Sequence, residues 1–109
     1  MDAALKALAE PRRREILRLV WSRELPATDI ADHFAEVTRS AISQHLSVLK
    51  EAALVTERRD GTRRLYRANA DTMQELRTFL DDYWTSGLSR LRDVAEAAEA
   101  RKRQKKGRH

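Results

Sequence analysis

The sequence predicts a mainly α-helical fold that contains one two-stranded β-hairpin and ends in a long helix. Apolar residues recur every three or four positions along most of the chain, which indicates helices. One arginine-rich stretch, "LVTERRDGTRRLYRA", instead places Asp60-Gly61 between two extended runs, the pattern of a tight hairpin. The chain has only three glycines and two prolines in 109 residues, so few positions interrupt the helices.

Two short amphipathic segments open the chain. Residues 2–9, "DAALKALA", place Leu5 and Leu8 three apart, which favours a helix. A second helix should begin near Pro11, because proline suits the first helical turn and Glu10 complements the positive end of the helix dipole. Its buried stripe would consist of Ile16, Leu17, Val20 and Trp21.

A third, short helix is expected over residues 27–34, "ATDIADHF", after Pro26 breaks the preceding pattern. It would bury Ile30, Ala31 and Phe34. Pro26 stands where a Ser or Thr cap is more usual, which leaves the start of this helix open.

The fourth helix, residues 38–52, has two contrasting faces, and Thr38 is a suitable N-cap for it. At about 100° per residue, its apolar face gathers Ile42, Leu46 and Leu49, flanked by Ala41, His45, Val48 and Ala52. The opposite face carries Arg39, Ser40, Ser43, Gln44, Ser47, Lys50 and Glu51. Small hydroxyls and an amide allow another surface to approach closely, and they can form hydrogen bonds with base edges in a DNA groove. The alternative is a merely solvated face.

The hairpin is expected over residues 54–68. A two-residue turn at Asp60-Gly61 would pair Val55 with Tyr66. Five arginines lie from Arg58 to Arg67 against one acid, which favours contact with nucleic acid. The alternative is a charged hairpin that protects an edge strand from aggregation.

A long helix should begin at Asp71. Its apolar or small residues approximate a heptad seam, formed by Met73, Leu76, Leu80, Tyr83, Gly87, Leu91 and Val94. A domain of this size cannot readily bury so long a helix against itself, so a partner is implied. The aromatic residues of "DDYW", Tyr83 and Trp84, are expected at this interface, with a carboxylate metal site or an aromatic ligand pocket as alternatives.

The charge distribution divides the chain into residues 1–100 and 101–109. The net charge is +5, but the last nine residues hold six Lys or Arg, which leaves 16 basic and 17 acidic residues in 1–100. Residues 1–100 should form one domain. Residues 101–109 are expected to be a disordered basic tail that either contacts DNA without sequence preference or keeps the end of the chain soluble.

Missing features exclude several classes of protein. The chain has no cysteine, which removes disulfides and thiolate metal sites. No apolar run approaches the ~20 residues of a membrane span, and the N-terminus lacks a signal-peptide pattern. We therefore expect a cytoplasmic protein without membrane contact.

The expected order of elements is that of a winged helix-turn-helix, and two motifs point to a family. "LKALAEPRRREIL" resembles the "LADPTRRxIL" signature of the ArsR/SmtB family of bacterial repressors. "SAISQHLSVLKEAALV" resembles the recognition-helix pattern "SQPTVSRHLKVLREAGLV" of the same family. The resemblance runs continuously over residues 5–67, and the C-terminal helix agrees in kind.

The resemblance implies a homodimer that docks two recognition helices, residues 38–52 of each chain, into successive major grooves of a palindromic double-stranded DNA operator. Family members typically repress a nearby operon, often including their own gene. The implied base-reading positions are Arg39, Ser40, Ser43, Gln44 and Ser47. The wing would reach phosphates or the minor groove through Arg58, Arg59, Arg63 and Arg64. The dimer interface would use Leu5, Leu8, Met73, Leu76, Leu80, Tyr83, Trp84 and Leu91.

The chain departs from the family pattern at three places, of which one is Pro26 before the third helix. Metal-sensing members carry a cysteine pair or Asp and His ligands on the last helix, whereas the histidines here are His33, His45 and His109, none of them in that helix. We therefore expect no metal and no cofactor. The glycine usual after the recognition helix is Ala53 here, at a point where a left-handed conformation is common.

Other functions have less support. An enzyme is disfavoured because the chain has no cysteine nucleophile, no glycine-rich phosphate loop and no grouped Ser, His and acid. The alternative function is a winged-helix dimer that binds DNA without sequence preference or serves as an adaptor for a protein partner. An adaptor would need an apolar patch on the recognition helix. The inducing signal is not readable: an unknown small molecule, a sequestering protein or autoregulated dosage would each fit.

Overall fold

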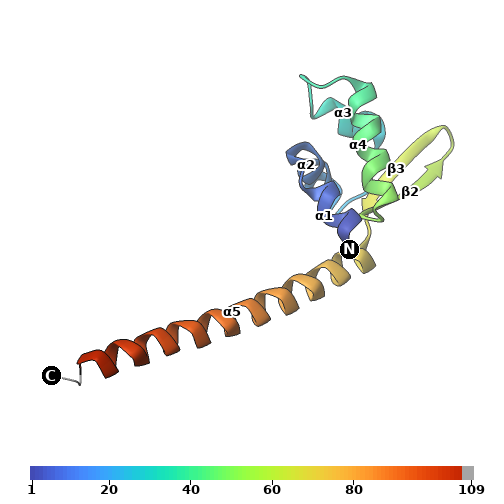
Figure 1. Ribbon diagram of the computed structural model, residues 1–109. Coiled ribbons are helices and arrows are strands. Elements are labelled where there is room, and N and C mark those ends of the chain that lie inside the picture. The colour runs from blue at the N-terminus through green and yellow to red at the C-terminus, as the bar shows by residue number, and fades with distance from the viewer. Residues whose placement is uncertain (107–109) are drawn as a thin grey trace. The chain divides into compact units, whose positions relative to one another are not determined.

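The computed structural model describes residues 1–106, which divide into two compact units. The first unit, Met1–Leu76, contains α1 (Asp2–Leu8), α2 (Pro11–Leu19), β1 (Leu25–Pro26), α3 (Ala27–Asp32), α4 (Arg39–Glu51), β2 (Val55–Asp60) and β3 (Arg63–Ala68). Figure 1 labels all of these elements except β1. The last helix, α5 (Ala70–Lys106), begins in this unit and forms the second unit from Arg77 on. The predicted fold class, mainly helical with a β-wing and a long C-terminal helix, is confirmed.

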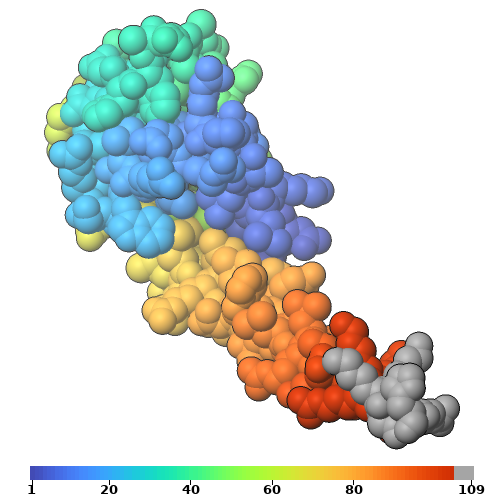
Figure 2. Space-filling view, turned by 90° about the vertical axis from the view of Figure 1, so that its left-hand side faces the viewer, coloured from blue at the N-terminus to red at the C-terminus, as the bar shows by residue number. Residues whose placement is uncertain are grey.

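The core of the first unit is built around α4. Its residues Ile42, Leu46 and Leu49 are at most 2% exposed, as the helical wheel predicts. Residues from α1, α2, α3 and β2 contact this helix. Figure 2 shows α1 and α2, in blue, directly against the cyan and green residues of the helix-turn-helix. The buried cluster also includes Ile16, Val20, Ile30, Leu54, Val55 and Tyr66.

The start of α2 is as predicted from the sequence, but the last residue of its predicted buried stripe is exposed. Pro11 occupies the first turn, and the Glu10 side chain caps the helix by accepting from the Arg13 backbone N–H at 3.0 Å. Burial of Trp21 is wrong: its side chain is 57% exposed, because α2 ends at Leu19 and the chain turns away before the indole can reach the core.

The turn between α1 and α2 is held by arginine side chains. Arg13 donates from Nε to the Ala7 carbonyl at 2.6 Å, and Arg14 donates to the Leu8 carbonyl at 2.7 Å. These carbonyls lie at the end of α1, where no backbone donor of the same helix remains for them. The arginines of "PRRRE" therefore cap α1.

Helix α4 is capped at both ends. At its start, the Thr38 hydroxyl accepts from the Ala41 N–H at 3.1 Å, so the predicted N-cap is confirmed. At its end, Ala53 has φ 59°, the left-handed conformation expected at this position. The Ala53 and Leu54 amides donate to the carbonyls of Lys50 and Leu49, which is a Schellman termination.

The hairpin is shifted from its predicted register. β2 and β3 pair antiparallel with Val55 opposite Ala68, so the predicted pairing of Val55 with Tyr66 is wrong by two residues. The turn is formed by Gly61 and Thr62, one position later than predicted, because Gly61 supplies the positive φ, 64°, at the first central position. A shift of two residues keeps each side chain on its predicted face.

A third short strand completes the sheet, whose order is β1-β3-β2. Leu25 pairs with Tyr66 and Pro26 with Leu65, on the open side of β3. Pro26 also precedes α3 as its N-cap, with no side-chain cap bond. The sequence predicts only two strands, since a two-residue strand that contains proline has no alternating pattern.

The long helix α5 contributes differently to the two units. In the first unit, Leu76 is buried and Met73 packs against the core. The predicted disorder after Ala100 is wrong for residues 101–106, which continue the helix to Lys106. These residues are good helix formers, and Glu99 pairs with Arg103 one turn apart at 4.0 Å. The rest of the predicted tail, residues 107–109, lies outside the described residues.

Candidate nucleic-acid interface

The polar face of α4 is fully available to solvent. The five side chains expected to read bases all come from this helix and are exposed: Arg39, Ser40, Ser43, Gln44 and Ser47. We call this set the polar arc. An open groove of about 450 Å³ runs along it and is lined by Ser40, Ser43, Gln44, Ser47, Val48 and Glu51. The sequence assigns Val48 to the flank of the core, but it is 37% exposed and lies beside the polar arc.

One member of the polar arc is linked to the preceding helix. Arg39 donates to the Asp32 carboxylate at 3.3 Å, with both side chains about two-thirds exposed. So exposed an ion pair is worth under ~1 kcal/mol. Arg39 is therefore free to exchange this partner for another anion.

The register separates the wing arginines into two sets. Residues opposite each other in an antiparallel pair point to the same face, so Arg59 and Arg64 share one face and the Arg58 and Arg63 side chains lie on the other. Glu57 lies on the face of Arg59 and Arg64, and it contacts Lys50 of α4. Arg59 and Arg64 therefore lie on the face of the wing that is turned to α4.

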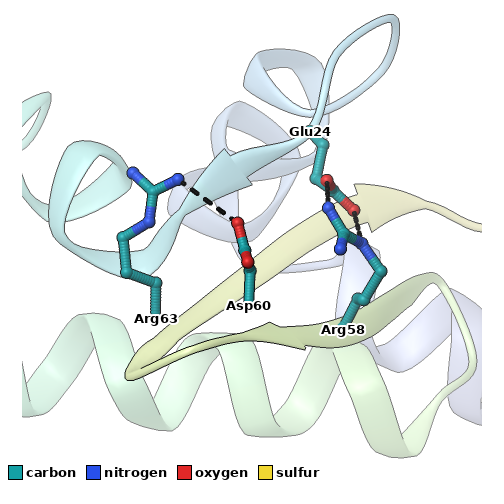
Figure 3. A network of polar contacts seen from close by, with 4 residues as sticks. All are labelled: Glu24, Arg58, Asp60 and Arg63. Atoms are coloured by element: carbon teal, nitrogen blue, oxygen red, sulfur yellow. Dashed lines mark hydrogen bonds and ion pairs between the residues drawn. The ribbon is translucent and has the colours of Figure 1, made fainter.

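The other set is occupied by ion pairs. Arg58 donates to both carboxylate oxygens of Glu24, at 2.6 and 3.1 Å, and Arg63 lies 3.8 Å from Asp60 (Figure 3). The bond from Arg58 lowers the pKa of the Glu24 carboxyl below its ordinary value. Because a bidentate pair fixes the guanidinium, Arg58 anchors the wing to the segment before β1.

A narrow cleft separates α4 from the wing. It has a volume of about 190 Å³ and is lined by Ala27, Ser43, Leu46, Ser47, Lys50, Glu57, Arg64 and Tyr66. Inside it, Glu57 accepts from the Tyr66 hydroxyl at 3.0 Å and from the Lys50 ammonium at 3.3 Å. This chain of contacts joins the core, the wing and α4.

The cleft shifts the pKa values of two groups. Burial raises the pKa of Glu57, but the hydrogen bonds from Tyr66 and Lys50 outweigh it, so the net pKa lies below the ordinary value. Burial, and then the bond to Glu57, raises the pKa of Tyr66. Glu57 is therefore a carboxylate, and Tyr66 a neutral donor, at neutral pH.

The expected dimer residues differ in burial. In the first unit, Leu5 is 37% exposed, Leu8 is half-buried, and α1 turns Ala4 and Ala7 into the core. In the second unit the apolar side chains are open to solvent: Leu80 is 48% exposed, Tyr83 74%, Trp84 67% and Leu91 67%. Phe79 stacks on Tyr83 with ring centroids 6.2 Å apart.

Neither a cluster of metal ligands nor a membrane-spanning helix is found among the described residues. Within residues 1–106, no three His, Asp or Glu side chains gather as metal ligands would. His33 contacts the Asp29 carbonyl through Nδ1 at 3.1 Å, and His45 is half-buried beside the core face of α4. Among the described helices, none combines the length and the hydropathy needed to cross a bilayer.

The roles of four residues of the site are not predicted from the sequence. Lys50, Glu57 and Tyr66 form their cleft only in the register that places Glu57 opposite Tyr66. Glu24 and Arg58 are 34 positions apart in the sequence, so no local pattern predicts their ion pair. The prediction from sequence also treats all four wing arginines alike, and only the sheet register separates them.

Known proteins are similar to this chain both in sequence and in structure. Residues 10–57, from the N-cap of α2 into β2, match the family described as bacterial regulatory protein, arsR family. The chain is 42% identical over 88 residues to an HTH-type transcriptional regulator of Mycobacterium tuberculosis, covering 81% of each. It is 36% identical over 75 residues to the transcriptional repressor SdpR of Bacillus subtilis, covering 69% of this chain and 82% of that protein.

Its structure is also similar to a crystal structure described as a possible transcriptional regulator for arsenical resistance. The TM-score is 0.70 and the sequence identity 44%, with 84% of this chain and 93% of the other covered.

Proposed function

Because the chain belongs to the arsR family of bacterial regulatory proteins, we propose that it is a homodimeric repressor that reads a palindromic operator, including one at its own promoter. It is a DNA-binding transcriptional regulator with a winged helix-turn-helix. The proposed part is the homodimeric assembly, the preference for an operator sequence and the residues responsible for each.

The observation that carries the proposal is the division of α4 into a buried face and the polar arc. Ser43 and Gln44 are exposed on a helix whose other side forms the core, so their side chains do not contribute to core packing. Their hydroxyl and amide groups can donate to and accept from base edges in the major groove. We assign base reading to the polar arc.

The wing supplies backbone contacts, and we assign these to Arg59 and Arg64. Both lie on the α4 side of the hairpin and directly opposite each other. Two like charges in opposed positions destabilise a hairpin unless an anion lies between them. A DNA phosphate would relieve this repulsion, whereas Arg58 already has the Glu24 carboxylate.

The second unit supports dimerisation. Leu80, Trp84, Leu91 and Val94 fall on one side of α5, and each is 45% or more exposed. A second copy of this helix would cover them at heptad-like spacing. A dimer would present two polar arcs, one for each half of a palindrome.

The signal that releases the DNA is outside these assignments. The chain has no cysteine to bind a thiophilic metal. An unknown small molecule or a protein inducer would each be compatible with repression. As a protein that binds chromosomal DNA, the regulator would act in the cytoplasm.

The proposal is tested by binding to labelled duplex DNA from upstream of its own gene and to a scrambled duplex, at several salt concentrations. The Ser43→Ala/Gln44→Ala variant is measured in parallel. We expect the variant to lose the preference for the upstream duplex and to keep salt-dependent binding to both, since its arginines remain. Binding that ignores sequence in the unmodified protein would favour an architectural protein or an adaptor instead.

A further inference from the structure

The cleft between α4 and the wing contains a carboxylate where a DNA-binding surface would be expected to carry only donors and cations. The Glu57 side chain is 16% exposed and shares the cleft with Ser43 and Ser47 of the polar arc. Its negative charge would repel a nearby phosphate, more strongly the less the solvent screens it. Its presence therefore calls for a positive reason.

Two contacts indicate what Glu57 does. It accepts from the hydroxyl of Tyr66, whose side chain belongs to the core and is 6% exposed overall. It also pairs at 3.3 Å with Lys50, in the last turn of α4, whose side chain is 55% exposed. The carboxylate thus connects a rigid residue with a long, flexible cation.

Lys50 without this partner would be a mobile ammonium beside the polar arc. Such a cation neutralises any phosphate within reach whatever the base sequence, and it adds most affinity where α4 is not already held by base contacts, that is, on non-specific DNA. Paired with Glu57, the ammonium lies beside a carboxylate that offsets its charge. The carboxylate therefore removes affinity that carries no sequence information, and it links α4 to β2.

We propose that Glu57 is a specificity-determining positioning residue, which ties Lys50 to Tyr66 and so keeps this lysine from acting as a sequence-independent phosphate contact. The inference rests on the proposed function, because it describes how a sequence-reading surface limits its own non-specific binding.

The experiment compares four variants with the unmodified protein: Glu57→Gln, Lys50→Ala/Glu57→Gln, Tyr66→Phe and Glu75→Gln. Glutamine keeps the shape of Glu57 and can still accept from Tyr66, but it has no charge to hold Lys50. Glu75 is an exposed acid at the start of α5, so its replacement is a control for net charge. Binding is measured by fluorescence anisotropy against the tightest duplex recovered from a random library and against a scrambled duplex, from low to high salt.

For Glu57→Gln we expect scrambled DNA to bind several-fold more tightly, with a slope of log affinity against log salt steeper by about one phosphate contact, or ~0.9. The ratio between the two duplexes should fall several-fold, because the released lysine adds more to scrambled DNA than to the preferred duplex, where base contacts already hold α4. In Lys50→Ala/Glu57→Gln the slope should return to its original value, because the released cation is gone. Tyr66→Phe leaves the ion pair in place but removes the hydrogen bond that positions Glu57, so the slope should stay unchanged while the ratio falls about threefold.

Two results would overturn the inference: equal behaviour of Glu57→Gln and Glu75→Gln, or a steeper slope that persists in the double variant. A failure of the proposed function looks different, since the random library would then yield no preferred duplex. The slopes on scrambled DNA would still decide whether Glu57 restrains Lys50. Thermal melting of every variant separates these effects from loss of the fold.

Discussion

At the scale of single residues, Ala53 is the position where the fold departs from what its side chain prefers. Its φ of 59° is the left-handed conformation, which costs an L-residue ~1 kcal/mol relative to glycine. The Schellman bonds and the buried Leu54 keep it there. We expect Ala53→Gly to raise the free energy of unfolding by roughly 1 kcal/mol, measured by chemical denaturation.

The matched control is the residue before it. Ala52 has φ −78° and ψ 2°, a negative φ at which glycine gains no steric advantage over alanine. Ala52→Gly should therefore lower the stability, by roughly 0.5–1 kcal/mol, because glycine only adds freedom to the unfolded chain. Equal effects of the two substitutions would contradict the assigned termination of α4.

A second prediction at this scale concerns acid. The folded pKa of Glu57 lies below its ordinary value of 4.5, so its ionisation stabilises the fold above about pH 4.5. This contribution is lost as the pH falls through the folded pKa. The groups that face it are the side chains of Lys50, Arg64 and Tyr66, and the pKa of Tyr66 is raised, so its hydroxyl remains protonated in this range.

The measurement is urea denaturation of the unmodified protein and Glu57→Gln between pH 7 and pH 3. We expect a difference in unfolding free energy of under ~1 kcal/mol, as for partly exposed pairs. It should be constant above pH 5 and shrink below pH 4.5. A difference that grew on acidification would mean that the carboxyl is destabilised by the fold.

At the scale of elements, the wing provides a comparison within one hairpin. Arg59→Gln/Arg64→Gln removes the two arginines on the α4 face, and Arg58→Gln/Arg63→Gln removes the same charge from the other face. We expect only the first variant to lower the salt slope of DNA binding, by ~0.9 for each phosphate that an arginine no longer neutralises. The second should retain the slope but melt at a lower temperature, since its wing no longer pairs with Glu24.

Salt titrations on scrambled DNA and thermal melts check this pair of variants. An equal decrease of slope in both would mean that the whole hairpin, and not one face of it, meets the backbone. A decrease only in Arg58→Gln/Arg63→Gln would place the DNA on the opposite side of the wing.

The elements also divide into those that sequence can predict and those that it cannot. α2 and α4 follow from periodicity and from their caps at Glu10 and Thr38, because these signals are local. The turn at Gly61 and Thr62 depends on which residue takes the positive φ, a choice that Asp60-Gly61 leaves undecided in sequence. β1 forms through pairing with β3, and no local pattern encodes it.

The candidate site divides in the same way. The polar arc is readable from sequence, since helical geometry alone separates Ser43 and Gln44 from the core face. The cleft is not, because Lys50 and Glu57 lie on different elements and meet only after the chain has folded. Local residue patterns therefore predict the surface that would read DNA, but not the contacts that hold it.

At the scale of the whole molecule, α5 raises the question of what covers its apolar side. Leu80 and Leu91 lie three turns apart on the side that also carries Trp84, and all three are 48% or more exposed. Leaving such side chains in water costs ~1.5–3 kcal/mol each relative to burial. A second α5 would remove that cost.

The last prediction tests this pairing. We expect Leu80→Glu/Leu91→Glu to convert a dimer into a monomer, because four carboxylates would face each other in the interface. Thr85→Glu/Ser89→Glu adds the same charge to the other side of α5 and should remain dimeric. Light scattering coupled to size exclusion measures the mass, 12.6 kDa for one chain.

The same variants connect assembly with function. A monomer presents one polar arc, so it should bind a palindromic duplex no better than a duplex that contains one half-site, whereas the dimeric control should retain a preference for the palindrome. If Leu80→Glu/Leu91→Glu stayed dimeric, the interface would lie elsewhere, with α1 and Leu5 as the next surface to change. If it became monomeric and still preferred the palindrome, DNA itself would bring the two copies together.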